Sequence, residues 1–162
     1  MSTAHQHLDR FADNLGLKAR GLRFALVISR WNSEITESMY KACFSSLVKA
    51  GAEVQDIQRT EVPGSFELVY ACRQLAVQRK FDAVVAIGSV IRGETPHFDF
   101  VCGAVSQGIK DINLLGESPV IFCVLTDDNL QQSLDRSGGK HGNKGHEAAA
   151  AAVEMALLKR SI

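Results

Sequence analysis

The sequence contains no apolar run long enough to span a lipid bilayer, which requires roughly 20 residues. Its longest apolar runs are Phe24–Ile28, Val120–Leu125 and Ala148–Val153. The first residues, from Met1 to Arg20, are polar and have no apolar core of the kind found in signal peptides. We therefore expect a cytoplasmic protein with no membrane partner.

The sequence also lacks an excess of charge of either sign. Its 18 lysine and arginine residues balance 18 aspartate and glutamate residues, so the formal net charge is zero. This balance argues against a broadly basic surface of the kind that binds nucleic acid, although a local basic patch is compatible with it. We expect no nucleic-acid partner. The apolar fraction of 46% and the charged fraction of 22% are typical of a folded globular domain.

Closely spaced cysteine pairs are absent. The four cysteines are far apart, at Cys43, Cys72, Cys102 and Cys123. The spacing excludes the Cys-x-x-Cys motifs of zinc and redox sites, and each thiol is predicted to be a small buried group in a reducing compartment. His141 and His146, with only Glu147 nearby as a carboxylate, are weak evidence for a metal site. We expect no metal and no cofactor.

Patterns typical of strands and helices alternate from Arg23 onward. The predicted strands are Phe24–Ile28, Val54–Val62, Asp82–Gly88 and Val120–Leu125. Helices are predicted to begin at Asn32 or Ser33, at Ser65, near His97, at Asn129 and after the glycine-rich residues 138–145. This alternation implies parallel strands with helices on both faces. We predict one α/β domain over residues 21–162, a three-layer α/β/α sandwich with a four-stranded parallel sheet, and a flexible arm over residues 1–20.

Four polar segments directly follow the predicted strands. They are Ser29–Asn32, Pro63–Glu67, Ser89–His97 and Thr126–Asp128. Ligands of open parallel sheets bind at the carboxyl ends of the strands. These four segments are therefore predicted to converge on the edge of the sheet that carries the binding site.

Trp31, the only tryptophan, lies in the first of these segments, between Arg30 and Asn32. An exposed indole in a polar loop can stack on a flat heterocyclic ring. A partly buried structural tryptophan is an ordinary alternative.

The segment Ser89–His97 carries the features of an anion site. Gly93 allows the backbone to turn, and the amides of Glu94 and Thr95 can point at an anion near the start of a helix. His97 lies at or near that helix start and could transfer protons near neutral pH. The alternative is a capping or hydrogen-bonded surface histidine.

A second cationic stretch runs from Arg136 to Glu147. It is not a Walker phosphate loop, because Gly139-Lys140 precedes His141 instead of serine or threonine, and because it follows a helix. Arg136 is suited to forked contacts with phosphate, although the stretch could also be a solvated loop. The residues alone thus predict a phosphate-bearing substrate beside a flat ring, without naming the reaction.

Five motifs in order and spacing resemble the 6,7-dimethyl-8-ribityllumazine synthase family. They are Ser29–Asn32, Val62–Glu67, Gly88–Asp99, Val124–Thr126 and Lys140–Gly145. The resemblance covers nearly everything from Leu22 to Leu158. It implies a flavodoxin-like fold and a transferase that condenses 5-amino-6-(D-ribitylamino)uracil with 3,4-dihydroxy-2-butanone 4-phosphate, the penultimate step of riboflavin synthesis.

The resemblance also implies roles for individual residues. Trp31 would stack on the uracil ring and His97 would donate and shuttle protons. Phosphate would be held by the backbone amides of Glu94 and Thr95 and by Arg136. Glu94 stands where small residues are frequent in the family, and we predict that its carboxylate points away from the phosphate. The remaining contacts to the uracil substrate and its ribityl chain would come from Ser65, Phe66, Glu67, Ser89, Val90 and Ile91.

The resemblance further implies assembly. Phe122 and Arg136 would reach the site from a neighbouring subunit of a homopentamer, with Lys144 and Glu147 as supporting residues. In some members twelve pentamers close into an icosahedral shell, and we expect the same here. The chain departs from the family pattern at Cys123, where glycine is frequent, and at Leu68-Val69. Two rival functions stay open: a flavin- or lumazine-binding module without turnover, and a protein whose function is to assemble into a shell.

Overall fold

The computed structural model describes residues 15–162, and residues 1–14 of the predicted arm lie outside the described residues. The rest of that arm packs against the domain. Leu15 and Ala19 are buried, and the Ala19 N–H donates a hydrogen bond to the carbonyl of Ala50 at 2.9 Å. Residues 15–20 therefore belong to the folded part of the chain.

The centre of the molecule is the predicted four-stranded parallel sheet, with strand order β2-β1-β3-β4. The strands are β1 (Phe24–Ser29), β2 (Ile57–Val62), β3 (Ala83–Ile91) and β4 (Val120–Asp127). All of β1 and the first seven residues of β3 are buried. These two central strands are covered on both faces, which explains their uninterrupted apolar runs.

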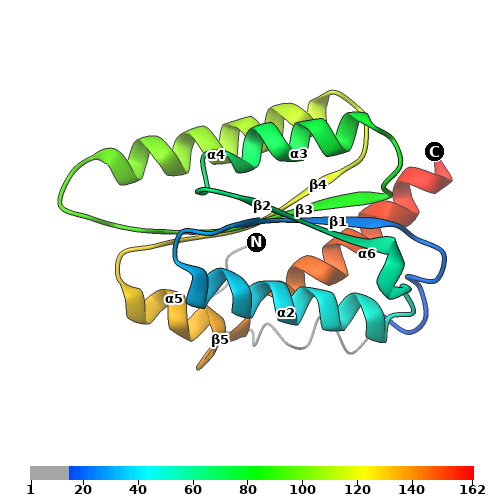
Figure 1. Cartoon of the computed structure of the whole chain (residues 1–162), viewed down its shortest axis with the longest axis horizontal. Coiled ribbons are helices and arrows are strands. Elements are labelled where there is room, and N and C mark those ends of the chain that lie inside the picture. The colour runs from blue at the N-terminus through cyan, green and yellow to red at the C-terminus, as the bar shows by residue number, and fades with distance from the viewer. Residues whose placement is uncertain (1–14) are drawn as a thin grey trace.

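Helices cover both faces of the sheet and give the three predicted layers (Figure 1). One face carries α3 (Leu68–Val77) and α4 (His97–Leu114). The other face carries α2 (Ser33–Lys49), α5 (Leu130–Arg136) and α6 (Lys144–Ser161). Each face has its own cluster of buried apolar residues. Within residues 15–162, no helix combines the length and the apolar character needed to cross a membrane.

Several element boundaries differ from those predicted. A short 3-10 turn (Val54–Asp56) replaces the beginning of the second predicted strand. The third and fourth strands run two or three residues further than predicted, because Ser89 pairs with Leu125 and Ile91 with Asp127. The glycine-rich link forms a small antiparallel pair, β5 (Ser137–Gly139) and β6 (Gly142–Asn143).

The packing of α2 against α6 depends on small residues. The alanine-rich face of α6 is buried, at Ala148, Ala149, Ala152 and Ala156. A Cβ atom on Gly145 would lie 2.1 Å from the carbonyl oxygen of Met39. Glycine is therefore required there for α6 to approach the backbone of α2.

Three of the four cysteines are buried, as predicted, and Cys102 on α4 is only partly buried. Burial raises the pKa of the Cys123 thiol to about 12 and also raises that of Cys72. The buried thiols act as small apolar groups in the core.

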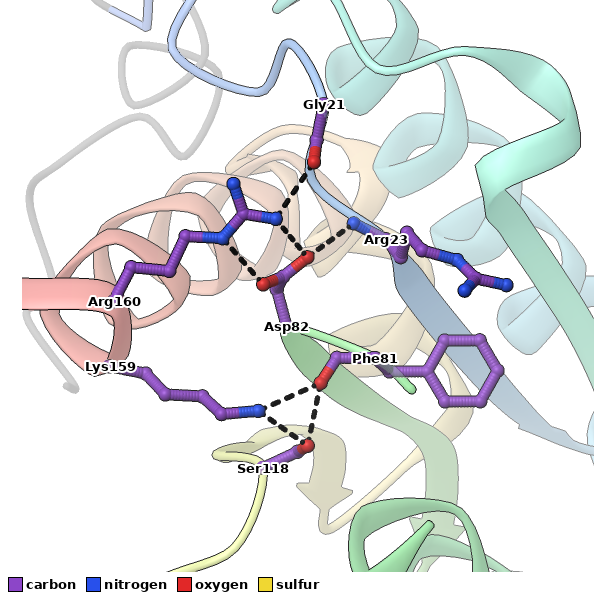
Figure 2. Close-up of polar contacts among 7 residues, drawn as sticks. All are labelled: Gly21, Arg23, Phe81, Asp82, Ser118, Lys159 and Arg160. Carbon is purple, nitrogen blue, oxygen red and sulfur yellow. Dashed lines mark hydrogen bonds and ion pairs between the residues drawn. The ribbon is translucent and has the colours of Figure 1, made fainter. Parts of the chain in front are cut away.

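At the amino edge of the sheet, Asp82 joins the last turn of α6 to the start of β1 (Figure 2). Its carboxylate accepts hydrogen bonds from the backbone N–H of Arg23 at 2.7 Å and from Arg160, whose Nε lies at 2.7 Å and Nη2 at 2.9 Å. Arg160 Nη2 also donates to the Gly21 carbonyl at 2.8 Å. The end of the chain is thus fixed to the entry of the sheet.

Lys159 makes a second link at the same edge (Figure 2). Its Nζ donates to the Phe81 carbonyl and to Ser118 Oγ, both at 3.0 Å. Ser118, which is 1% exposed, donates in turn to the Phe81 carbonyl at 2.6 Å. The segments that lead into β3 and β4 are therefore tied to each other and to α6.

Candidate active site at the carboxyl edge of the sheet

A cavity of about 680 Å³ opens at the carboxyl edge of the sheet, where the sequence predicts the binding site. Its walls come from the segments that follow β1, β2 and β3 and from the first turns of α4. The lining residues are Trp31, Asn32, Gly64, Ser65, Phe66, Glu67, Ser89, Val90, Ile91, Gly93, Thr95, His97, Phe98 and Val101. Three of the four predicted segments thus meet here. The fourth, after β4, does not line the cavity.

Two aromatic side chains form an exposed wall of the cavity. Trp31 is 72% exposed and Phe66 is 58% exposed. The Trp31 backbone is nevertheless fixed, because its N–H donates to the Pro63 carbonyl at 3.1 Å and that of Arg30 donates to Val62 at 2.9 Å. Within the single chain, Trp31 is therefore not a partly buried structural residue. The indole is presented to the cavity from a rigid backbone and is free to stack on a ring.

Polar contacts fix the base of the cavity. The Ser89 carbonyl accepts a hydrogen bond from Asn32 Nδ2 at 3.1 Å and a longer one from Ser65 Oγ at 3.5 Å. The Gly64 N–H donates to the Glu67 carboxylate at 2.9 Å. The sequence predicts a helix that begins at Ser65, whereas α3 begins at Leu68 and has no side-chain cap. The Ser65 hydroxyl is bonded to Ser89 and the Glu67 carboxylate to Gly64, so neither side chain is free to cap the helix.

Close packing brings Ser65 against the sheet. A Cβ atom on Gly88 would lie 2.7 Å from Ser65 Oγ and 2.9 Å from Leu68 Cδ1. Gly88 therefore sets how near the residues after β2 approach β3. Ser89, the next residue, has a buried hydroxyl that finds no hydrogen-bond partner within the described chain.

The turn that precedes α4 carries the predicted anion site. Helix α4 begins at His97, and no side chain caps its first turn. Thr95 and His97 both line the cavity, whereas Glu94 is exposed and is not part of the lining. Backbone N–H groups at an uncapped helix start attract anions. An oxyanion and the histidine side chain can thus lie next to each other at this end of the cavity.

Besides Glu94, four of the residues named by sequence do not line the cavity in the single chain. Phe122 lies on β4 and Arg136 ends α5. Lys144 and Glu147 are in the first turn of α6, both 9% exposed, with Lys144 Nζ at 2.7 Å from Glu147 Oε1. Within the chain these two form a buried ion pair between helical neighbours.

Some lining residues have no binding role assigned from the sequence. Asn32 lies in one of the four segments predicted to reach the binding edge, but the sequence assigns it only to the start of a helix. Phe98 and Val101 follow His97 by one and four residues. Residues four apart lie on the same side of a helix, so Val101 could have been predicted as a lining residue from the position of His97. In the range 15–162 there is no group of three or more His, Cys, Asp or Glu side chains able to hold a metal ion.

The fold and the site together define a class of protein. A parallel flavodoxin-like sheet has a cavity at its carboxyl edge, and that cavity holds an exposed indole, an uncapped helix start and a histidine. These features define an α/β protein with a candidate ligand-binding site at the carboxyl edge of its sheet.

Comparison with known proteins identifies the family. The family model of 6,7-dimethyl-8-ribityllumazine synthase matches residues 21–160. A 6,7-dimethyl-8-ribityllumazine synthase from Christiangramia forsetii is 51% identical over 99% of this chain and 96% of its own length. One from Flavobacterium johnsoniae is 51% identical over 99% of this chain and 84% of its own, and one from Clostridium kluyveri is 45% identical over 90% and 95%. The chain belongs to the 6,7-dimethyl-8-ribityllumazine synthase family of enzymes.

Proposed function

We propose that this enzyme condenses 5-amino-6-(D-ribitylamino)uracil with 3,4-dihydroxy-2-butanone 4-phosphate in the cytoplasm. The products are 6,7-dimethyl-8-ribityllumazine, phosphate and water, in the penultimate step of riboflavin synthesis. The observation that carries the proposal is the placement of Trp31, Thr95 and His97 around one cavity. A flat ring, a phosphate and a proton carrier are the three things that this reaction brings together.

The uracil substrate is assigned to the aromatic side of the cavity. Its ring stacks on Trp31. Its polar edge and ribityl hydroxyls contact the residues after β2 and at the end of β3, namely Ser65, Phe66, Glu67, Ser89, Val90 and Ile91. These residues line the cavity at fixed positions, which supports the assignment.

The sugar phosphate is assigned to the helix start. The amides of Glu94 and Thr95 bind its phosphate, and the Glu94 carboxylate stays outside the cavity. An amine of the uracil substrate attacks the ketone, and a first water leaves as the imine forms. Phosphate is then eliminated, and the ribitylamino nitrogen closes the ring on the remaining carbonyl with loss of a second water. His97 carries protons between these steps, and holding both substrates together supplies the rest of the rate acceleration.

The site is completed by a second subunit in this proposal. Phe122 and Arg136 do not line the cavity of their own chain, which agrees with their reaching the cavity of a neighbour in a homopentamer. Arg136 binds the phosphate there, and Lys144 and Glu147 support this contact from the start of α6. Closure of twelve such pentamers into an icosahedral shell is part of the same proposal.

The direct test mixes the purified protein with both substrates and follows lumazine fluorescence against a control without protein. The proposal predicts a rate clearly above that of the control. Saturable binding of the product without any turnover would instead favour the binding-module alternative. Light scattering measures the assembly, and a fully active monomer would contradict the shared site.

Arg136→Ala tests the role of the neighbouring subunit. Loss of a forked contact is expected to raise KM for the sugar phosphate by about 10-fold to 100-fold, because a hydrogen bond to a charged group contributes about 1.5–3 kcal/mol. KM for the uracil substrate is the internal control and should change little. Equal increases in both KM values would contradict the assigned role.

A further inference from the structure

Arg92 fixes one end of the turn that leads to the proposed phosphate site. It directly follows β3, and its backbone N–H donates to the Asp127 carbonyl at the end of β4 at 2.9 Å. The next residues, 93–96, are exposed and make the turn into α4. The sheet thus holds the turn where it begins.

The Arg92 side chain also holds the turn where it ends. Its Nε donates to Asp128 at 2.9 Å, and its Nη1 lies 3.2 Å from a carboxylate oxygen of Asp99 in the first turn of α4. The guanidinium lies 4.1 Å from the ring centroid of Phe98, which lines the cavity. One side chain therefore joins both ends of the loop that carries Thr95 and His97.

These contacts are poorly suited to stabilising the fold. Arg92, Asp99 and Asp128 are 42%, 62% and 66% exposed, and exposed ion pairs contribute little to folding. The same three groups are well suited to fixing a geometry, because the flat guanidinium binds in one orientation. The hydrogen bond to Asp128 and the nearby Asp99 raise the pKa of Arg92, so the guanidinium is charged throughout the working range.

Arg92 also balances negative charge beside the cavity. Without it, the Asp99 and Asp128 carboxylates would be left unpaired near the helix start at which the phosphate is proposed to bind. Unpaired carboxylates beside this turn would repel a bound phosphate, because like charges repel even near a protein surface. The guanidinium thus removes a repulsion as well as fixing a turn.

We propose that Arg92 is a positioning residue that holds the 93–96 turn in its phosphate-binding geometry and neutralises Asp99. The inference rests on the proposed function, because it assumes that the phosphate of the substrate binds at this turn.

Arg92→Gln tests the inference, with Arg79→Gln as the matched control. Arg79 is likewise exposed and pairs with a carboxylate, Glu117, but it does not line the cavity. In Arg92→Gln, KM for the sugar phosphate is expected to rise about fivefold to tenfold, as expected for an uncompensated charge near the site. KM for the uracil substrate and the thermal midpoint should match those of Arg79→Gln.

Two further variants separate charge from geometry. Arg92→Lys keeps the charge and loses the fork, so its KM should fall between those of wild type and Arg92→Gln. The double variant with Arg92→Gln and Asp99→Asn no longer carries the unpaired Asp99 charge. It should therefore recover part of the affinity for the sugar phosphate that Arg92→Gln loses. An unchanged KM for the sugar phosphate in Arg92→Gln, or equal rises in both KM values, would overturn the inference.

Calorimetry with inorganic phosphate tests the inference without requiring turnover. Weaker phosphate binding by Arg92→Gln than by wild type and Arg79→Gln supports the inference even if the wild type does not make lumazine. Equal phosphate affinity in all three proteins overturns it. Absence of turnover by the wild type contradicts only the proposed function.

Discussion

The two edges of the sheet differ in how their polar groups are hydrogen-bonded and in which side chains they expose. At the amino edge, Asp82, Lys159 and Ser118 are joined by hydrogen bonds to backbone and side chains (Figure 2). At the carboxyl edge, Trp31 is largely exposed and the buried Ser89 hydroxyl has no partner within residues 15–162. The polar groups of the amino edge are paired with one another, whereas the carboxyl edge presents groups that a ligand could satisfy.

The comparison shows how one sheet can separate stability from binding. The hydrogen bonds at the amino edge fix the residues that lead into the strands and the last turn of α6. This leaves the carboxyl edge able to keep an open cavity, where unpaired polar groups and exposed aromatic rings cost stability. Substitutions at the carboxyl edge should therefore change activity, and those at the amino edge should change stability.

His97→Ala should give the largest effect, at the carboxyl edge. The variant loses the proton carrier, and kcat is expected to fall about 100-fold, the lower range for general acid–base catalysis. Activity should not vanish, because the positioning of the two substrates survives. The free energy of unfolding should change by less than about 0.5 kcal/mol, since the side chain is exposed. A wild-type kcat would contradict the role of His97.

Trp31→Ala should come next. Loss of stacking, which contributes about 1–3 kcal/mol per base, should raise KM for the uracil substrate about thirtyfold. Trp31→Phe is the matched control, because a smaller flat ring retains most of the contact. If both variants bound the uracil substrate like the wild type, the aromatic wall would not be the ring site.

Asp82→Ala should produce the opposite pattern. Removing the acceptor of three hydrogen bonds at the amino edge is expected to lower the free energy of unfolding by about 2 kcal/mol. Chemical denaturation measures this change. kcat and both KM values of the folded protein should match the wild type, and a selective loss of activity would break the separation between the edges.

Ser118→Ala should have the smallest effect of the four. It deletes one buried hydroxyl that bridges Lys159 and the Phe81 carbonyl, so a loss of about 1 kcal/mol in unfolding free energy is expected. The same denaturation experiment measures it. A loss larger than that of Asp82→Ala would show that the lysine link, and not the aspartate, dominates this edge.

The layered fold could be predicted because its signals are local. The uninterrupted apolar runs of β1 and β3 indicate strands covered on both faces, and the amphipathic stretches between strands indicate the covering helices. The ends of β3 and β4 could not be predicted in the same way, because Ser89 and Asp127 are polar. They are strand residues only through pairing between β3 and β4, which no local pattern reveals.

Part of the candidate site could be predicted by the same reasoning. Strand ends at one edge of a parallel sheet must converge, so the order of strands and loops along the chain is enough to place Trp31, Ser65 and His97 together. The positioning role of Arg92 could not be predicted, because it depends on Asp128 after a different strand. Phe122 entered through the family resemblance, as did the placement of Arg136 in a neighbouring subunit's site, and both stay predictions because they depend on a second chain.

The most direct test of the account is a fluorescence titration of the single tryptophan with 6,7-dimethyl-8-ribityllumazine. If the ring binds against Trp31, indole emission should be quenched in a saturable manner, and 5-amino-6-(D-ribitylamino)uracil should compete for the same site. Unchanged Trp31 emission at concentrations of the lumazine that fully inhibit the enzyme would contradict the central claim.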